Sequence, residues 1–127
     1  METLDKAYYE ANPNVICKDP AMLQPVMQTC VALLQKQFPC KLVETWRSNA
    51  REQMLFAQGK SHTHNSLHSQ SLAVDVYPLP DGYNIDSDGI DKLHTTWRAI
   101  AVGHGYPQTA FAGFDPLHCS LNNGTHI

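Results

Sequence analysis

Two histidines and two aspartates are the residues of this chain whose types and spacing could do chemistry. His68 and Asp75 lie close together in one segment, and His118 follows near the end of the chain. Two imidazole nitrogens and a carboxylate oxygen form a ligand set for Zn2+, and three protein ligands leave a fourth position open, as in catalytic zinc sites. Asp115, just before His118, could act as a general base toward a water on the metal. The sequence therefore predicts a metal-dependent hydrolytic site.

The segment around Asp75 predicts a loop that leads into a strand. Residues 72–77 alternate between apolar side chains on one face and a face that carries Asp75. A buried carboxylate needs a partner, which sets this aspartate apart from a surface residue. We expect His68 to lie back over the strand and His118 to come from a neighbouring strand. Each histidine alone has an ordinary alternative, a surface loop or a hydrogen-bonded core position, so only the combination indicates a metal site.

Other residues compete for a metal ion. His62 and His64 precede the motif and could bind a transition metal loosely, but we interpret them as loop residues or substrate contacts, with His64 as a substrate-binding candidate. An acidic stretch leaves calcium open as a ligand: Asp81, Asp86, Asp88 and Asp91. The spacing of these aspartates is not that of an EF-hand. Capping of a following helix by Ser87 or Asp88 explains them more simply.

Hydrophobic periodicity predicts three main helices and three strands. The helices are expected at about residues 24–38, with Pro25 in the first turn, 50–58 and 89–104, with a short one at 4–11, and the strands at 41–46, 72–77 and 117–121. Helices and strands do not alternate in repeated strand–helix–strand units. The expected fold is therefore α+β: a small, mainly antiparallel sheet with three main helices packed against it and the zinc site on the sheet face. The length favours a single domain over residues 1–127.

Composition excludes several classes of protein. Hydrophobic residues make up 43% and charged residues 17%, which is an ordinary globular balance. The net charge of −3, without a basic stripe, argues against a nucleic-acid partner. No apolar stretch reaches the roughly 20 residues of a membrane span. The polar start of the chain is not a secretory signal, so we expect synthesis in a cytoplasm. We also expect a monomer.

The four cysteines form no C-x-x-C pair: Cys17, Cys30, Cys40 and Cys119. Zinc-ribbon and thioredoxin-like sites are therefore not indicated. We expect reduced and mostly buried thiols. A nucleophilic pair of Cys119 with His118 is disfavoured, because adjacent residues on a strand point to opposite faces.

These motifs resemble a family of zinc peptidases that includes D-alanyl-D-alanine carboxypeptidases and dipeptidases, and the L-alanyl-D-glutamate endopeptidases of bacteriophage endolysins. The family pattern is S-x-H-x-x-G-x-A-x-D, followed further along the chain by [ED]-x-x-H. The matching residues are Ser66, His68, Ala73, Asp75, Asp115 and His118. Residues 44–48, with Gln53 and Gly59 after them, resemble the family's step from a strand through Arg and Ser into a helix. The resemblance runs from about residue 23 to 121.

The resemblance implies a function and roles for these residues. Zinc held by His68, Asp75 and His118 would activate a water, and Asp115 would take its proton and pass it to the leaving amine. Arg47 would stabilise the oxyanion or hold a substrate carboxylate; its ordinary alternative is a surface ion pair with Glu44 or Glu52. Ser66 would orient the substrate or a loop carbonyl, or simply form a turn, and Gln53 would support the site.

The expected substrate is a peptidoglycan stem peptide, and the expected activity is that of an L-alanyl-D-glutamate endopeptidase. Asp rather than Glu at position 115 resembles that branch. The chain would then act on the bacterial cell wall after holin-type release or as a virion component. Two alternatives remain open: D-Ala-D-Ala carboxypeptidase activity, and a non-catalytic zinc-binding module on the same scaffold. Ser71 stands where the family has Gly, and it would be strained if that position requires a positive φ.

Overall fold

The computed structural model describes residues 5–61, 63, 66–111, 113 and 115–124. Its centre is a three-stranded antiparallel sheet in the order β1 (Cys40–Glu44), β2 (Ala73–Pro78) and β3 (His118–Ser120). The described residues also form four α-helices: α1 (Lys6–Ala11), α2 (Pro25–Gln37), α3 (Asn49–Ala57) and α4 (Ser87–Gly103). Two short 3-10 helices, η1 (Pro20–Met22) and η2 (Gly82–Asn84), complete the elements. The predicted α+β fold with an antiparallel sheet is confirmed.

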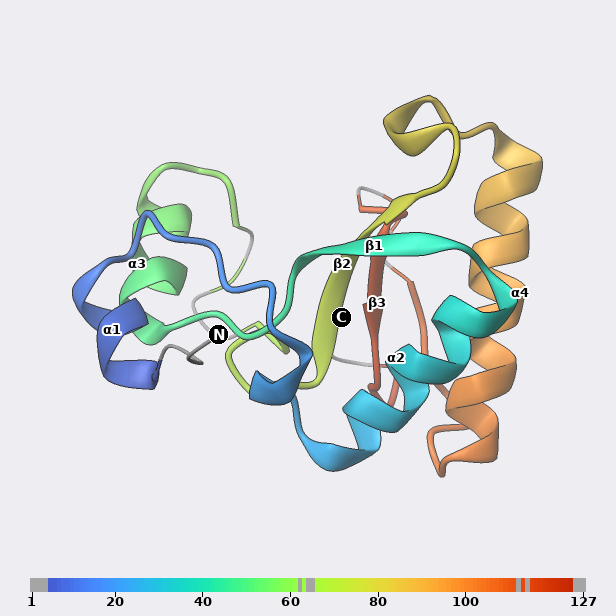
Figure 1. Cartoon of the computed structure of the whole chain (residues 1–127), viewed down its shortest axis with the longest axis horizontal. Coiled ribbons are helices and arrows are strands. Elements are labelled where there is room, and N and C mark those ends of the chain that lie inside the picture. Colours follow the sequence, from blue (N-terminus) through green and yellow to red (C-terminus); the bar gives the residue numbers. More distant parts are fainter. Residues whose placement is uncertain (1–4, 62, 64–65, 112, 114, 125–127) are drawn as a thin grey trace.

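The main hydrophobic core lies between one face of the sheet and the helices α2 and α4 (Figure 1). Val74 and Val76 of β2 and Cys119 of β3 point into it, as the alternation of these strands predicts. Trp97 of α4 is fully buried there and donates its indole N–H to the carbonyl of Ser120 at 2.8 Å. This contact joins α4 to the strand that also carries His118.

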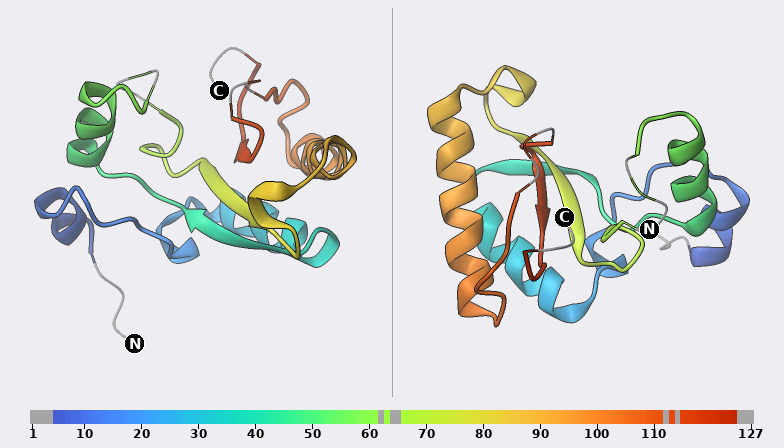
Figure 2. Two further views of the ribbon diagram at one scale, coloured as in Figure 1. Left: turned by 90° about the horizontal axis from the view of Figure 1, so that it is seen from above. Right: turned by 180° about the vertical axis from the view of Figure 1, so that it is seen from behind.

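The helix predicted at about residues 50–58 occupies a different place from the other two main helices. We predicted that it packs on the sheet, but α3 pairs with α1, and the two lie side by side at the end of the molecule opposite α4 (Figures 1 and 2). A small separate apolar cluster contains Tyr9, Cys17 and Trp46. Glu10 of α1 accepts the backbone N–H of Asn49 at 2.6 Å, so α1 covers the beginning of α3.

Local signals explain most of the helix ends. Pro25 starts α2 in its first turn, as predicted, because the missing N–H is not needed there. Ser48 caps α3 by accepting the N–H of Arg51. The cap of α4 is Asp86, which accepts the N–H of Gly89 at 2.8 Å, rather than Ser87 or Asp88 as predicted.

The acidic stretch is used for this capping, and its four aspartates form no shared ligand group in the described part of the chain. Cys17, Cys30, Cys40 and Cys119 are all free and buried, which confirms the expectation for the thiols. Within the described residues, no helix has both the length and the apolar character needed to cross a bilayer.

Ser71 has a φ of 60°, the left-handed conformation that L-residues with a Cβ rarely adopt. The residue is buried, and its backbone N–H donates to the carbonyl of His68 at 3.2 Å. The conformation closes the turn between the segment that carries His68 and β2. The position therefore has the backbone requirement that favours Gly, and this chain meets it with Ser.

Replacing Ser71 by Gly should stabilise the protein. The left-handed conformation costs a residue with a Cβ about 1–2 kcal/mol, and Gly loses about 0.5–1 kcal/mol more backbone entropy on folding. The free energy of unfolding should therefore rise by up to about 1 kcal/mol in urea denaturation. Ser71→Ala is the matched control: it keeps the Cβ and should give no gain. A Gly variant less stable than the Ala variant would refute the strain at this position.

Candidate metal centre

Three ligand atoms converge on the face of the sheet opposite the hydrophobic core. Nε2 of His68, Oδ1 of Asp75 and Nδ1 of His118 form a triangle in which each pair of atoms lies 3.2 Å apart. A tetrahedral zinc with bonds of about 2.0–2.1 Å requires about 3.3 Å between neighbouring ligand atoms. The triangle therefore has the size of one face of a zinc coordination tetrahedron. Among the described residues, this is the group that could hold a metal ion.

The sheet explains how two of these residues meet. Asp75 of β2 and His118 of β3 are directly paired across the antiparallel ladder, so their side chains project from the same face. Their neighbours Val74 and Cys119 point into the core instead. The predicted placement of the carboxylate and the second histidine on one sheet face is confirmed.

His68 reaches the same point from the loop before β2. Its Nδ1 lies 2.9 Å from the carbonyl of Thr45, and its own carbonyl accepts the backbone N–H of Arg47 at 3.1 Å. Because a carbonyl only accepts, Nδ1 carries the proton, and the neutral ring presents the lone pair of Nε2 to the site. A partner of this kind fixes the tautomer of a ligating histidine.

The donor set fits a cation. Nε2 of His68 and an oxygen of Asp75 are lone-pair sites, and Nδ1 of His118 adds a third when the proton of its neutral ring is on Nε2. Nε2 of His118 is buried and has no hydrogen-bond partner among the described residues. Three converging lone pairs repel one another unless a proton or a metal ion lies among them.

The charges of the site shift the pKa values of its members. Burial alone would raise the pKa of Asp75, but the charge of His68 and hydrogen bonds from both histidines outweigh burial and hold the pKa well below its usual range. Burial likewise acts to lower the pKa of His68, yet the carboxylate of Asp75 raises it overall. In the metal-free protein His68 therefore holds a proton more readily than a free histidine does, at the place where the metal would bind.

Asp115 lies within electrostatic reach of these ligands. Its pKa is raised, first by burial and then by the charge of Asp75, although His118, His68 and Arg47 act in the opposite direction. Its carbonyl accepts the N–H of His118 at 3.3 Å. A carboxyl group with a raised pKa beside a metal site is suited to accept and return a proton.

The segment that carries Asp115 is fixed to α4. His94 donates Nε2–H to the carbonyl of Pro116 at 2.7 Å, and its ring stacks on Phe111 with centroids 3.8 Å apart. The guanidinium of Arg98 lies over the ring of Phe111, 5.4 Å from its centroid. Helix α4 thus packs in the core and also fixes the segment that carries the candidate base.

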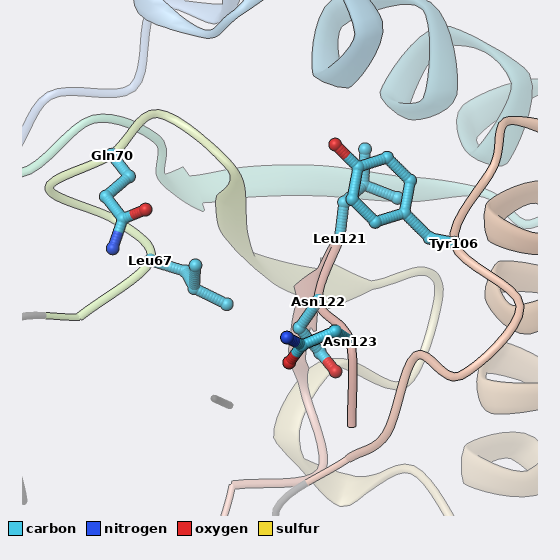
Figure 3. Close-up of a pocket in the computed structure, with 6 residues that line it drawn as sticks. All are labelled: Leu67, Gln70, Tyr106, Leu121, Asn122 and Asn123. Carbon is cyan, nitrogen blue, oxygen red and sulfur yellow. The ribbon is translucent and has the colours of Figure 1, made fainter. Parts of the chain in front are cut away.

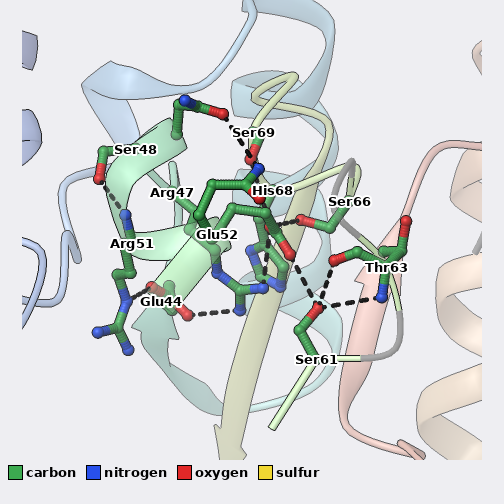
Figure 4. Close-up of polar contacts among 12 residues, drawn as sticks. Glu44, Arg47, Ser48, Arg51, Glu52, Ser61, Thr63, Ser66, His68 and Ser69 are labelled. Carbon is green, nitrogen blue, oxygen red and sulfur yellow. Dashed lines mark hydrogen bonds and ion pairs between the residues drawn. The ribbon is translucent and has the colours of Figure 1, made fainter. Parts of the chain in front are cut away.

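Arg47 forms ion pairs with two glutamates, the alternative that the sequence left open (Figure 4). Its guanidinium lies 2.7 Å from Glu44 and 3.3 Å from Glu52, and Arg51 binds the second oxygen of Glu44 at 2.6 Å. The pairs are buried rather than on the surface, since the side chain of Arg47 is 11% exposed. Its charge still acts on His68 and Asp75.

A β-bulge brings this network to the metal centre. Leu42 of β1 pairs with Val76, which faces the core, whereas Glu44 pairs with Asp75, which faces the site. Regular alternation would have put Leu42 and Glu44 on the same face. The extra residue between them, Val43, changes the face, as bulges near functional sites commonly do.

The substrate-binding candidates have different places. Ser66 is buried, and its hydroxyl donates to Glu52 through a short hydrogen bond, so a contact with substrate stays a prediction. Gln53 is exposed on α3, with its amide 3.4 Å from Asn49. His64, like His62, lies outside the described residues.

Sequence reasoning missed Glu52. It was considered only as an ion-pair partner for Arg47, whereas its side chain is completely buried beside the loop of His68. Its sequence neighbours are polar, so no local pattern indicates that this side chain is buried. The available signal was its position directly before Gln53, the residue that the family resemblance had pointed to.

A pocket of about 230 Å³ lies between the loop of His68 and the end of β3 (Figure 3). The residues that line it are Leu67, Gln70, Tyr106, Leu121, Asn122 and Asn123. One of these residues, Leu67, directly precedes His68 in the sequence, but none of the three candidate ligands lines the pocket. The amide of Asn122 is already bound to the backbone of Ala110 and to Ser120.

Comparisons with known proteins bear on the fold. The crystal structure of the L-Ala D-Glu endopeptidase ChiX from Serratia marcescens matches with a TM-score of 0.66 and 24% sequence identity, over 81% of this chain and 83% of that chain. The two chains share a fold. No protein-family model and no curated protein matches the sequence.

The metal-free and metal-bound forms should respond to pH in opposite directions. Because the folded pKa of His68 is raised above the unfolded value of about 6.5, its contribution is complete below that pH and is lost as the pH rises through the folded pKa. The free energy of unfolding in chelator should therefore fall as the pH rises above the unfolded value of about 6.5. Zinc competes with the same proton, so its affinity should fall below about pH 6.

Urea denaturation with chelator and zinc titration at each pH would measure the two trends. His68→Gln should remove the pH dependence of the metal-free protein that this histidine causes. A zinc affinity that stays flat between about pH 5 and pH 8 would contradict histidine ligation.

Proposed function

We propose that this protein is a zinc-dependent peptidase that cleaves peptidoglycan stem peptides. The observation that supports this most is the triangle of His68, Asp75 and His118, whose 3.2 Å edges match one face of tetrahedral zinc, so that three protein ligands would leave a fourth position for water or substrate. The second support is the shared fold with a structure described as an L-Ala D-Glu endopeptidase.

Each residue has a distinct part in the proposed reaction. When bound, zinc would polarise the scissile carbonyl and acidify the attacking water. The carboxylate of Asp115 takes a proton from that water as it attacks the carbonyl carbon, and gives it to the amine nitrogen as the peptide bond breaks. Thr45 holds the ring of His68 in the tautomer that ligation needs. Arg47 contributes positive charge near the oxyanion, and its ion pairs with Glu44 and Glu52 reduce that contribution.

We further propose that the bond cleaved is that between L-Ala and D-Glu. The support is the shared fold with the L-Ala D-Glu endopeptidase ChiX and the presence of Asp at position 115. Action on the bacterial cell wall after holin-type release, or from a virion, remains a prediction of the same kind.

Asp115→Asn should separate catalysis from metal binding. The variant removes the proton acceptor but leaves the three ligands, so the rate of wall-peptide hydrolysis should fall by about 10²- to 10⁴-fold while bound zinc stays stoichiometric. Asp91→Asn is the matched control, since Asp91 is an exposed aspartate on α4. Turbidity clearance of cell walls and metal analysis of the same samples would measure both. Hydrolysis by Asp115→Asn at the wild-type rate would exclude this base.

The products of muropeptide digestion should identify the bond. The proposed activity generates peptides with a new N-terminal D-Glu, which mass analysis after amine labelling detects. Release of free D-Ala without that terminus would instead establish carboxypeptidase activity. Absence of any cleavage by zinc-loaded protein would favour the non-catalytic zinc-binding module.

A further inference from the structure

Glu52 is a fully buried carboxylate that the proposed chemistry does not use. It lies on α3, and four side chains direct donors at it (Figure 4). Arg47 approaches Oε2 at 3.3 Å, Ser61 approaches Oε1 at 2.8 Å and Ser69 approaches Oε2 at 3.3 Å. Ser66 forms a short hydrogen bond to Oε2. A carboxylate without solvent contact therefore has its acceptor positions filled by the chain itself.

The three serines share one location, the segment between α3 and β2. This segment contains no helix or strand among its described residues, yet it carries His68. Ser66 and Ser69 lie two residues before and one residue after that histidine. The carboxylate of Glu52 thus joins α3 to both sides of the candidate ligand.

A second set of contacts fixes the same loop from the other direction. The carbonyl of His68 accepts the backbone N–H of Arg47, and its Nδ1 faces the carbonyl of Thr45 at 2.9 Å. Arg47 is also a partner of Glu52. The residues that follow β1 and the carboxylate on α3 therefore both fix this loop. Arg47 takes part in both sets of contacts, through its backbone N–H to His68 and through its side chain to Glu52.

The network specifies one arrangement of the loop. A buried carboxylate is costly unless its hydrogen bonds are satisfied. Burial acts to raise the pKa of Glu52, but Ser66, Ser61 and Arg47 lower it overall, so the group is charged in this arrangement. Moving Ser66 or Ser69 away would leave that charge without its donors.

We propose that Glu52 is a positioning residue that preorganises His68 for the metal ion by holding the loop on both sides of it. The inference rests on the proposed metal site and extends it beyond the atoms that contact the ion. Partners that orient a ligand without touching the metal commonly change metal affinity by about 10- to 100-fold.

Glu52→Gln tests this with a side chain of the same shape. Its zinc dissociation constant, measured by competition with a chromophoric chelator, should rise by about 10-fold or more. The visible spectrum of the Co2+ form should change because His68 is less well oriented. Glu44→Gln is the matched control: Glu44 is a buried carboxylate and a partner of Arg47, but it binds arginines rather than the loop serines. It removes the same charge and should weaken zinc binding less.

Ser66→Ala keeps the inference testable if Glu52→Gln does not fold. Ser66 is preferable to Ser61, whose hydroxyl also lies 2.9 Å from the carbonyl of Thr63. The alanine variant should weaken zinc binding, and where the double variant folds, the two effects should be less than additive. Wild-type zinc affinity in Glu52→Gln or, where that variant does not fold, in Ser66→Ala would overturn the role of Glu52 and leave the proposed function intact. A wild-type protein that binds no zinc would overturn both.

Discussion

The repulsion among three converging lone pairs is the constraint on which the rest of this structure depends. Nε2 of His68, Oδ1 of Asp75 and Nδ1 of His118 lie 3.2 Å from one another, and no arrangement of the neutral rings puts a proton between every pair. Such a cluster persists only if the surrounding chain holds each group in place and a positive charge compensates them. The direct pairing of β2 with β3, the Thr45 carbonyl behind His68 and the Glu52 network each supply part of that restraint.

The two faces of this small sheet have different roles: one packs in the hydrophobic core and the other carries the candidate metal ligands. Its two adjacent strands, β2 and β3, give one face to apolar packing against α2 and α4 and the other to the ligands. The bulge at Val43 gives β1 the same division, because Leu42 stays on the core face while Glu44 is directed to the face of the site. Glu44 then binds Arg47, and Arg47 reaches Glu52. One extra residue in β1 therefore couples the sheet to the loop that holds His68.

The sequence predicts some of these features well because they depend on short-range periodicity. Alternation places Asp75 opposite the apolar face of its strand, and helical spacing locates α2 and α4. The bulge in β1 and the burial of Glu52 depend on contacts between distant segments, which no local pattern records. Gln53 illustrates the difference: it was chosen as a supporting residue, yet one position along a helix turns a side chain by about 100°. Glu52 faces the loop, whereas Gln53 is exposed.

The loop of His68 combines two features that act in opposite directions. Ser71 adopts a φ of 60°, which strains the backbone at the entry to β2, while the donors around Glu52 stabilise the turn just before it. A strained residue persists when its surroundings determine the conformation, and the buried carboxylate provides that determination. The loop is thus ordered by a side-chain network rather than by secondary structure. A histidine ordered in this way before the metal arrives spares the binding step most of the entropy of fixing the loop, so the free energy of ligation goes into affinity.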